Sequence, residues 1–161
     1  MSEAECNNAD WALRGEDDGR LGYRRDRVNE HSKACAEFGV KPDLQAYSDG
    51  WAKGIRTFCT PAKGWQTGKE GSSYQNSCPP ELETPFYEAY DLGAKIFAQQ
   101  ATVTSLEVAL DEINADLNEL LGDSEEKKKL KKKRKQLKRD LADGQAELFL
   151  LELDAQQRGF Q

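Results

Sequence analysis

Long apolar runs are absent from this chain of 161 residues. No stretch reaches the roughly 18 consecutive apolar residues of a membrane-spanning helix, so we expect no segment of it to cross a bilayer. The first residues, MSEAEC, also lack the apolar centre of a secretory signal. Hydrophobic residues make up only 37% of the chain and charged residues 32%, which predicts a thin core or an elongated shape. The net charge of −6 disfavours nucleic acid as a partner.

Histidine is scarce too, and this excludes several kinds of catalytic and metal site. His31 is the single histidine, so no histidine pair is available to hold a metal. Because it lies in a charged stretch, we expect a solvated helix histidine rather than a triad member. Gly64 to Glu70 resembles a phosphate-binding loop only superficially, since Glu stands where Ser or Thr must bind magnesium. The sequence therefore predicts a protein that is not an enzyme and has no cofactor and no metal.

The four cysteines all lie in the first half of the chain. An even set in a short segment is typical of a disulfide framework, and the pairs Cys6–Cys35 and Cys59–Cys78 close the shortest loops. Disulfides indicate a periplasmic, secreted or surface location. Zinc is the alternative, because His31 and Cys35 are spaced to share one helix face.

The chain divides in composition near Pro79-Pro80. Residues 1–81 hold the cysteines, the tryptophans and most of the glycines, and they predict a small disulfide-stapled helical head. We expect helices from a capping box at Ser2 toward Leu13, from 26 to 38 and from 44 to 58, and an irregular Gly-rich loop from 60 to 80. Residues 82–161 predict a long antiparallel coiled-coil hairpin, which makes the fold class all-α.

Apolar residues recur at heptad spacing in both arms of this hairpin. A turn near 122–124 would pair residues whose numbers add up to 247, such as Leu110 with Leu137 and Val103 with Gly144. The first arm is acidic from 107 to 119 and the second is basic from 127 to 139. We therefore expect opposite charges to face each other and to set the orientation of the arms.

Three pairs of glycines are spaced four residues apart, at Gly15 and Gly19, Gly50 and Gly54, and Gly64 and Gly68. The segment 46–50 is also weakly similar to the segment 89–93. Such glycines expose a smooth strip on a helix. They can form a ligand groove, but close helix packing in a small core is the interpretation we favour.

Two surfaces are candidates for binding. The lysine-rich stretch is typical of a solvated coiled-coil face, and an anion-binding surface is the alternative, with Lys127, Lys128, Lys131, Lys132 and Lys135 as its residues. In the head, Trp11, Trp51 and Trp65 could offer aromatic rings to a cell-wall glycan.

The head resembles an uncharacterised family of Gram-negative envelope lipoproteins, domain-of-unknown-function family 2799, over about residues 2–97. The residues that carry the resemblance are Ser2 to Cys6, Asp10-Trp11, Gly15, Asp18-Gly19, His31, Cys35, Pro42-Asp43-Leu44, Tyr47, Gly50, Phe58 to Pro61, Gly64, Gly68, Gly71, Tyr74, Cys78-Pro79, Tyr90 and Gly93. The resemblance implies export, with anchoring to the outer membrane by a lipidated cysteine upstream of this sequence. It implies no activity.

These observations lead us to expect a periplasmic, outer-membrane-anchored lipoprotein that acts as a scaffold. Its hairpin would bind an envelope protein or a second copy of the chain. The membrane would be reached only through the N-terminal lipid. The alternatives are a head that binds or processes a cell-wall glycan and a basic hairpin that binds anionic lipid surfaces.

Overall fold

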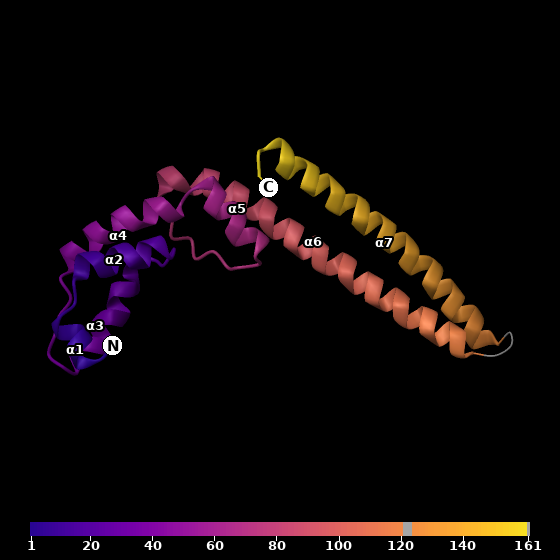
Figure 1. Cartoon of the computed structure of the whole chain (residues 1–161), viewed down its shortest axis with the longest axis horizontal. Helices are drawn as coiled ribbons and strands as arrows, with labels where there is room; N and C mark the ends of the chain where they lie inside the picture. The colour runs from indigo at the N-terminus through magenta and orange to yellow at the C-terminus, as the bar shows by residue number, and fades with distance from the viewer. Residues whose placement is uncertain (121–123, 161) are drawn as a thin grey trace. The chain divides into compact units, whose positions relative to one another are not determined.

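The computed structural model describes residues 1–120 and 124–160, and these residues contain helices and no strand, as the sequence predicts (Figure 1). The expected turn near 122–124 falls largely outside the described residues. The helices are α1 (Glu3–Asn7), α2 (Trp11–Arg20), the 3-10 helix η1 (Arg25–Arg27), α3 (Val28–Ala36), α4 (Leu44–Phe58), α5 (Pro61–Lys69), α6 (Pro80–Glu119) and α7 (Glu125–Gln157). None of the described helices is long and apolar enough to serve as a membrane span.

The chain forms two compact units, unit 1 (Met1–Gly93) and unit 2 (Ala94–Gln161). This division lies twelve residues beyond the expected end of the head at residue 81. The reason is that the first turns of α6 pack within unit 1. Phe86 is fully buried there in a core cluster with Ile55, Phe58 and Cys59. The helix then continues without a break into unit 2.

Side-chain caps explain where the helices of unit 1 begin. The predicted capping box at Ser2 is present, with Ser2 accepting from the Glu5 amide and the Glu5 carboxylate accepting from the Ser2 amide. However, α1 ends at Asn7, because Asp10 caps a new helix at Trp11. Asp43 and Thr60 cap α4 and α5 in the same way.

The segment 60–80 was predicted to be an irregular loop, and this prediction is wrong for its first half, which forms α5. Thr60 accepts a hydrogen bond from the Lys63 amide, and Pro61 occupies the first turn, where its missing N–H is no loss. These two residues start α5, which continues to Lys69. Glycine lowers the intrinsic helix propensity of α5. Close packing against α6 at Gly64 offsets this cost.

Both disulfides form as the sequence predicts. Cys6 is bonded to Cys35 and Cys59 to Cys78, and no cysteine is free. The zinc alternative is therefore wrong, since Cys35 has no thiolate to offer next to His31. No group of residues able to hold a metal occurs in the part of the chain that the structure describes.

The glycine pairs pack helices backbone to backbone, which is the interpretation favoured from the sequence. A Cβ atom on Gly15 would overlap the Tyr47 carbonyl, and one on Gly54 would overlap the Glu16 carbonyl, so α2 and α4 touch along both pairs. A Cβ on Gly64 in α5 would likewise overlap the carbonyl of Phe86 in α6. Since backbone fills this space, the glycines leave no groove for a ligand.

This packing shows that unit 1 contains the same arrangement twice. A Cβ on Gly54 would lie 2.9 Å from the Arg20 amide nitrogen, and one on Gly93 would lie 2.8 Å from that of Lys69. Arg20 and Lys69 each directly follow the second glycine of a pair. Gly93 is therefore the structural counterpart of Gly54, and the sequence similarity that aligned it with Gly50 is displaced by one helical turn.

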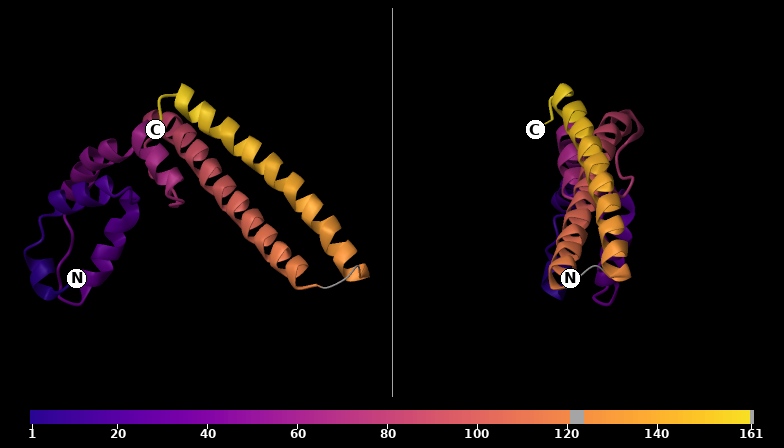
Figure 2. Two further views of the ribbon diagram at one scale, coloured as in Figure 1. Left: turned by 45° about the vertical axis from the view of Figure 1, so that its right-hand side comes forward. Right: turned by 90° about the vertical axis from the view of Figure 1, so that its right-hand side faces the viewer.

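In unit 2, α7 runs beside the later turns of α6 (Figure 2). Val103, Leu110, Ile113 and Leu117 on α6 are buried. A Cβ on Gly144 would be 3.5 Å from Val103, and the Gln99 side chain donates a hydrogen bond of 3.0 Å to the Gly144 carbonyl. These apolar positions form the core of unit 2.

Candidate functional site

A buried carboxylate connects three helices of unit 1. Asp18, on α2, has a side chain that is only 8% exposed. The Tyr47 hydroxyl on α4 donates to Asp18 Oδ2 over 2.8 Å, and His31 Nε2 on α3 lies 2.7 Å from the same oxygen. Arg27, at the end of η1, places its Nε atom 3.4 Å from Oδ1. The carboxylate thus ties α2 to both neighbouring helices.

His31 is a member of this buried cluster, so the expectation of a solvated histidine was wrong. Its side chain is 12% exposed and lies beside the rings of Trp11 and Tyr47, with centroids 6.4 and 6.0 Å away. The residues next to His31 in sequence are charged, and they gave no sign that this face of α3 turns inward onto Asp18.

Tyr47→Phe is expected to lower the free energy of unfolding at pH 7 by about 1–3 kcal/mol, because it leaves a buried carboxylate with one donor fewer. Burial and the hydrogen bond to Asp18 both raise the pKa of the Tyr47 hydroxyl above its usual value. In the folded state this hydroxyl stays protonated above pH 10, whereas in the unfolded chain it ionises. Stability is therefore lost as pH rises through this range.

Because phenylalanine cannot ionise, the stability difference between wild type and Tyr47→Phe should shrink as pH rises from 9 to 11. Urea unfolding at each pH, monitored by far-UV circular dichroism, measures this difference. Leu13→Ala, which removes an exposed side chain of α2, is the control and should show no such pH dependence relative to wild type. A difference for Tyr47→Phe that is constant or grows with pH would contradict the assignment.

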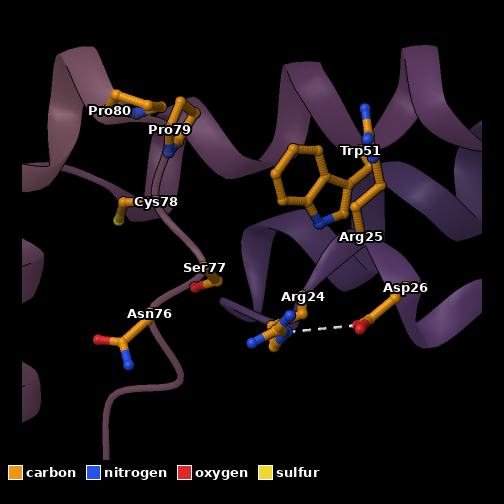
Figure 3. A pocket seen from close by; sticks show the side chains of 9 residues that line it. All are labelled: Arg24, Arg25, Asp26, Trp51, Asn76, Ser77, Cys78, Pro79 and Pro80. Atoms are coloured by element: carbon orange, nitrogen blue, oxygen red, sulfur yellow. Dashed lines mark ion pairs between the residues drawn. The ribbon is translucent and has the colours of Figure 1, made fainter.

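A cleft of unit 1 lies beside this cluster, since residues 24–26, which directly precede Arg27, line it. It has a volume of about 390 Å³. We call it the arginine cleft, and its lining residues are Arg24, Arg25, Asp26, Trp51, Asn76, Ser77, Cys78, Pro79 and Pro80. Figure 3 shows Arg24 and Asp26 on one side, Asn76 and Ser77 on the loop opposite, and the Trp51 ring between them at one end.

The walls of the arginine cleft are fixed by contacts behind them. Trp51 donates from its indole nitrogen to the Tyr23 carbonyl over 2.8 Å, and the Arg27 guanidinium lies 3.6 Å from the centre of the Tyr23 ring. On the opposite wall, the Cys59–Cys78 disulfide holds the loop, and the Cys78 amide donates to the Tyr74 hydroxyl. The cleft is therefore preformed rather than assembled by a moving segment.

The three tryptophans do not form one surface. Trp11 and Trp65 are buried, with 9% and 7% of their surface exposed. Only Trp51 lines the cleft, where it is partly exposed. The expected three-ring platform for a glycan is therefore wrong, because two of the rings are used in packing.

The other lining residues of the cleft were not identified from the sequence. Arg24-Arg25 and Asn76-Ser77 are about fifty residues apart, and only the fold brings them together. The Arg24-Arg25 doublet in a chain of net charge −6 is a signal that could have drawn attention to it.

The lysine-rich stretch of α7 lies on the surface. Lys132 and Lys135 line a hollow of about 610 Å³ with Lys129, Lys133, Gln136 and Arg139. The other three lysines of the predicted anion-binding surface do not line this hollow. Lys127 donates to the Leu120 carbonyl, Lys128 pairs with Glu125, and Lys131 is exposed outside the hollow.

The expected ion pairs between the arms are not formed. No carboxylate of α6 is within 4.0 Å of a lysine or arginine nitrogen between 127 and 139, as far as the described residues extend. Glu107, Asp111, Glu112, Asp116 and Glu119 are all exposed. Exposed ion pairs contribute little to stability, so their absence costs the packing of the two helices little.

α7 also carries a second apolar strip away from its contact with α6. Phe149 is 64% exposed, Leu150 63% and Leu153 38%. With the exposed Ala142 and Ala146, they recur at steps of three and four, which places them on one side of the helix. We call these five residues the outer stripe.

Comparisons with known proteins place unit 1 in a family. Residues 10–95, more than half of the chain, match the family model described as protein of unknown function, DUF2799. The match includes the Asp18 cluster and the arginine cleft, and it ends before most of unit 2. No curated protein and no solved structure matched the chain. The chain therefore belongs to the DUF2799 family of proteins of unknown function.

Proposed function

We propose that this chain is the exported part of a periplasmic lipoprotein that is anchored to the outer membrane and acts as a scaffold rather than an enzyme. In this proposal unit 2 is an antiparallel coiled-coil hairpin that binds another envelope protein. Unit 1 is the disulfide-stapled base that carries the hairpin.

The contacts of unit 2 support a coiled coil. Val103 lies beside Gly144, since a Cβ added to Gly144 would be 3.5 Å from its side chain, and this agrees with pairing of residues whose numbers add up to 247. Leu110 and Leu117 are buried, and their expected partners Leu137 and Leu130 are half-buried. An apolar strip at heptad spacing on both helices favours this side-by-side packing.

Export is supported by the cysteines. Both disulfides lie in unit 1, and Cys6 and Cys35 are almost completely buried. Disulfides of this structural kind persist in oxidising compartments and are rare in the cytosol. The lipid anchor and the outer membrane are proposed from the resemblance to envelope lipoproteins.

The observation that carries the scaffold function is the outer stripe. Leu148 and Leu151 follow Gly144 by four and seven residues and therefore share its side of α7, and both are half-buried, whereas Phe149, Leu150 and Leu153 are exposed. Large apolar side chains in a continuous exposed strip are typical of a protein-binding surface. A strip at steps of three and four is the pattern by which one helix packs against another.

Photocrosslinking in cells tests this proposal. With benzoylphenylalanine in place of Phe149, we expect a crosslinked product of one defined mass in envelope fractions. The same group in place of Glu147 is the matched control, because Glu147 is exposed two residues away and points to another side of α7. With the crosslinker in place of Ala146 instead, Phe149→Ser should reduce the product at least tenfold, while the helix content measured by circular dichroism stays unchanged.

The other possible results of the crosslinking experiment identify a different partner or contradict the proposal. A product of twice the chain mass identifies a second copy as the partner. Equal crosslinking from 147 and 149 contradicts a specific stripe. If no product forms and the chain instead sediments with anionic vesicles, in a way that salt and Lys132→Gln with Lys135→Gln abolish, the basic face of α7 binds lipid and the scaffold proposal is wrong.

A further inference from the structure

We propose that the arginine cleft of unit 1 is a binding site for a small organic anion, namely a ring-shaped molecule such as a sugar that carries one carboxylate or phosphate group. This site is separate from the outer stripe, and it does not depend on the scaffold function proposed above.

The size and rigidity of the cleft suit such a ligand. A volume of about 390 Å³ lies at the lower end of the range of roughly 300–1,000 Å³ for small-molecule sites. The Tyr23 carbonyl holds one wall through Trp51, and the Cys59–Cys78 disulfide holds the other. Since the backbone of both walls is held before binding, the entropy lost when a ligand enters is mainly that of the arginine side chains.

The charges of the cleft favour an anion. Arg24 and Arg25 contribute two positive charges, and Asp26 contributes one negative charge. Arg24 places its Nε atom 3.4 Å from Asp26 Oδ1, an ion pair that leaves its terminal nitrogens available. Arg25 has no ion pair with any residue that the structure describes. The planar guanidinium group matches carboxylate and phosphate oxygens in geometry, so the surplus positive charge selects these groups.

Ser77 supplies independent support for a polar ligand. The residue is only 6% exposed, and its Oγ atom has no hydrogen-bond partner among the described residues. Buried hydroxyls in folded proteins nearly always have a partner, and a lone one calls for an explanation. Because Ser77 lines the cleft, a rotation of its side chain would bring this hydroxyl to a bound ligand, whose oxygen would accept a hydrogen bond from it.

The apolar part of the lining determines the rest of the ligand. Trp51, Pro79 and Pro80 provide an apolar wall beside the polar groups (Figure 3). A flat or ring-shaped body can pack on the indole while its acid group reaches the arginines. A free inorganic anion would leave this wall in contact with water. We therefore expect the organic anion to bind more tightly than phosphate alone.

Tryptophan fluorescence of the full, disulfide-bonded chain tests the site, because Trp51 alone among the three tryptophans is partly exposed. The probes are glucuronate for the carboxylate, glucose 1-phosphate for the phosphate, inorganic phosphate, and neutral glucose. We expect saturable changes with one or both sugar acids, weaker binding of inorganic phosphate and no binding of glucose. Which sugar acid binds tighter identifies the acid group.

Variants separate this site from general charge effects. Arg25→Gln should weaken binding of the sugar acid at least about tenfold, and Ser77→Ala by a smaller factor. Arg20→Gln is the matched control, since Arg20 is an exposed arginine of unit 1 that pairs with Asp17 outside the cleft. Far-UV circular dichroism checks that each variant folds. The proposal is overturned if neither sugar acid produces a saturable change up to about 10 mM, or if Arg20→Gln weakens binding as much as Arg25→Gln.

Discussion

Gly50→Ala is expected to destabilise unit 1 by more than about 3 kcal/mol and to leave it largely unfolded at 37 °C. The added Cβ would overlap the Ala12 carbonyl and lie 2.7 Å from its carbon. Ala12 lies in the first turn of α2, and its backbone atoms cannot move aside as a flexible side chain can, so the two helices must separate. Thermal unfolding monitored by near-UV circular dichroism of the buried Trp11 and Tyr47 measures the loss.

Gly144→Ala is the matched control for this prediction. Gly144 also lies in a helix, but a Cβ there would meet nothing closer than 3.4 Å, and that nearest atom is the end of the Gln99 side chain. Because alanine favours helix over glycine by about 1 kcal/mol, this variant should be neutral or slightly stabilising. If the two variants had equal stability, close packing between α2 and α4 would be disproved.

Removing the Cys6–Cys35 disulfide by Cys6→Ala with Cys35→Ala is expected to lower the free energy of unfolding by about 3–4 kcal/mol. The bond joins residues 29 apart in sequence and restricts the unfolded chain accordingly. It also lies in a core cluster with Trp11 and Tyr47, and unit 1 has few other large apolar residues to replace it. Urea unfolding of the double variant measures the loss.

The second disulfide gives a comparison within the same unit. Cys59–Cys78 spans 19 residues, so its removal should cost about 3 kcal/mol on the same estimate. It should also be the first to be reduced, because Cys78 is partly exposed whereas Cys6 and Cys35 are buried. Native protein should contain no reactive thiols. Four reactive thiols in protein taken from cells would contradict both bonds and the exported location.

Local features of the fold were predictable because they depend on neighbours in sequence. The capping box at Ser2 requires only Glu5 three residues later, and the start of α4 requires only Asp43 before Leu44. The cysteine pairs were predictable for a related reason, since loop closure favours partners that are near in sequence. α5 was missed because its glycines were judged as loop residues.

The candidate sites could be predicted only in part. The arginine cleft joins 24–26 with 76–80, and the Asp18 cluster joins α2, α3 and α4. No spacing rule connects such distant residues. The same limit applies to the tryptophans, because composition cannot show that Trp11 and Trp65 are buried while Trp51 lines a cleft.

The sequence by itself determined that this protein is helical and that its second half carries a heptad strip on each arm, and it favoured two disulfides in the first half over a zinc site. These properties follow from short-range patterns that act before the chain is compact. Only the tertiary structure decided which glycines touch backbone, that His31 faces Asp18, and where a cleft remains. Those outcomes depend on how helices pack, and packing brings together atoms that the order of residues leaves far apart.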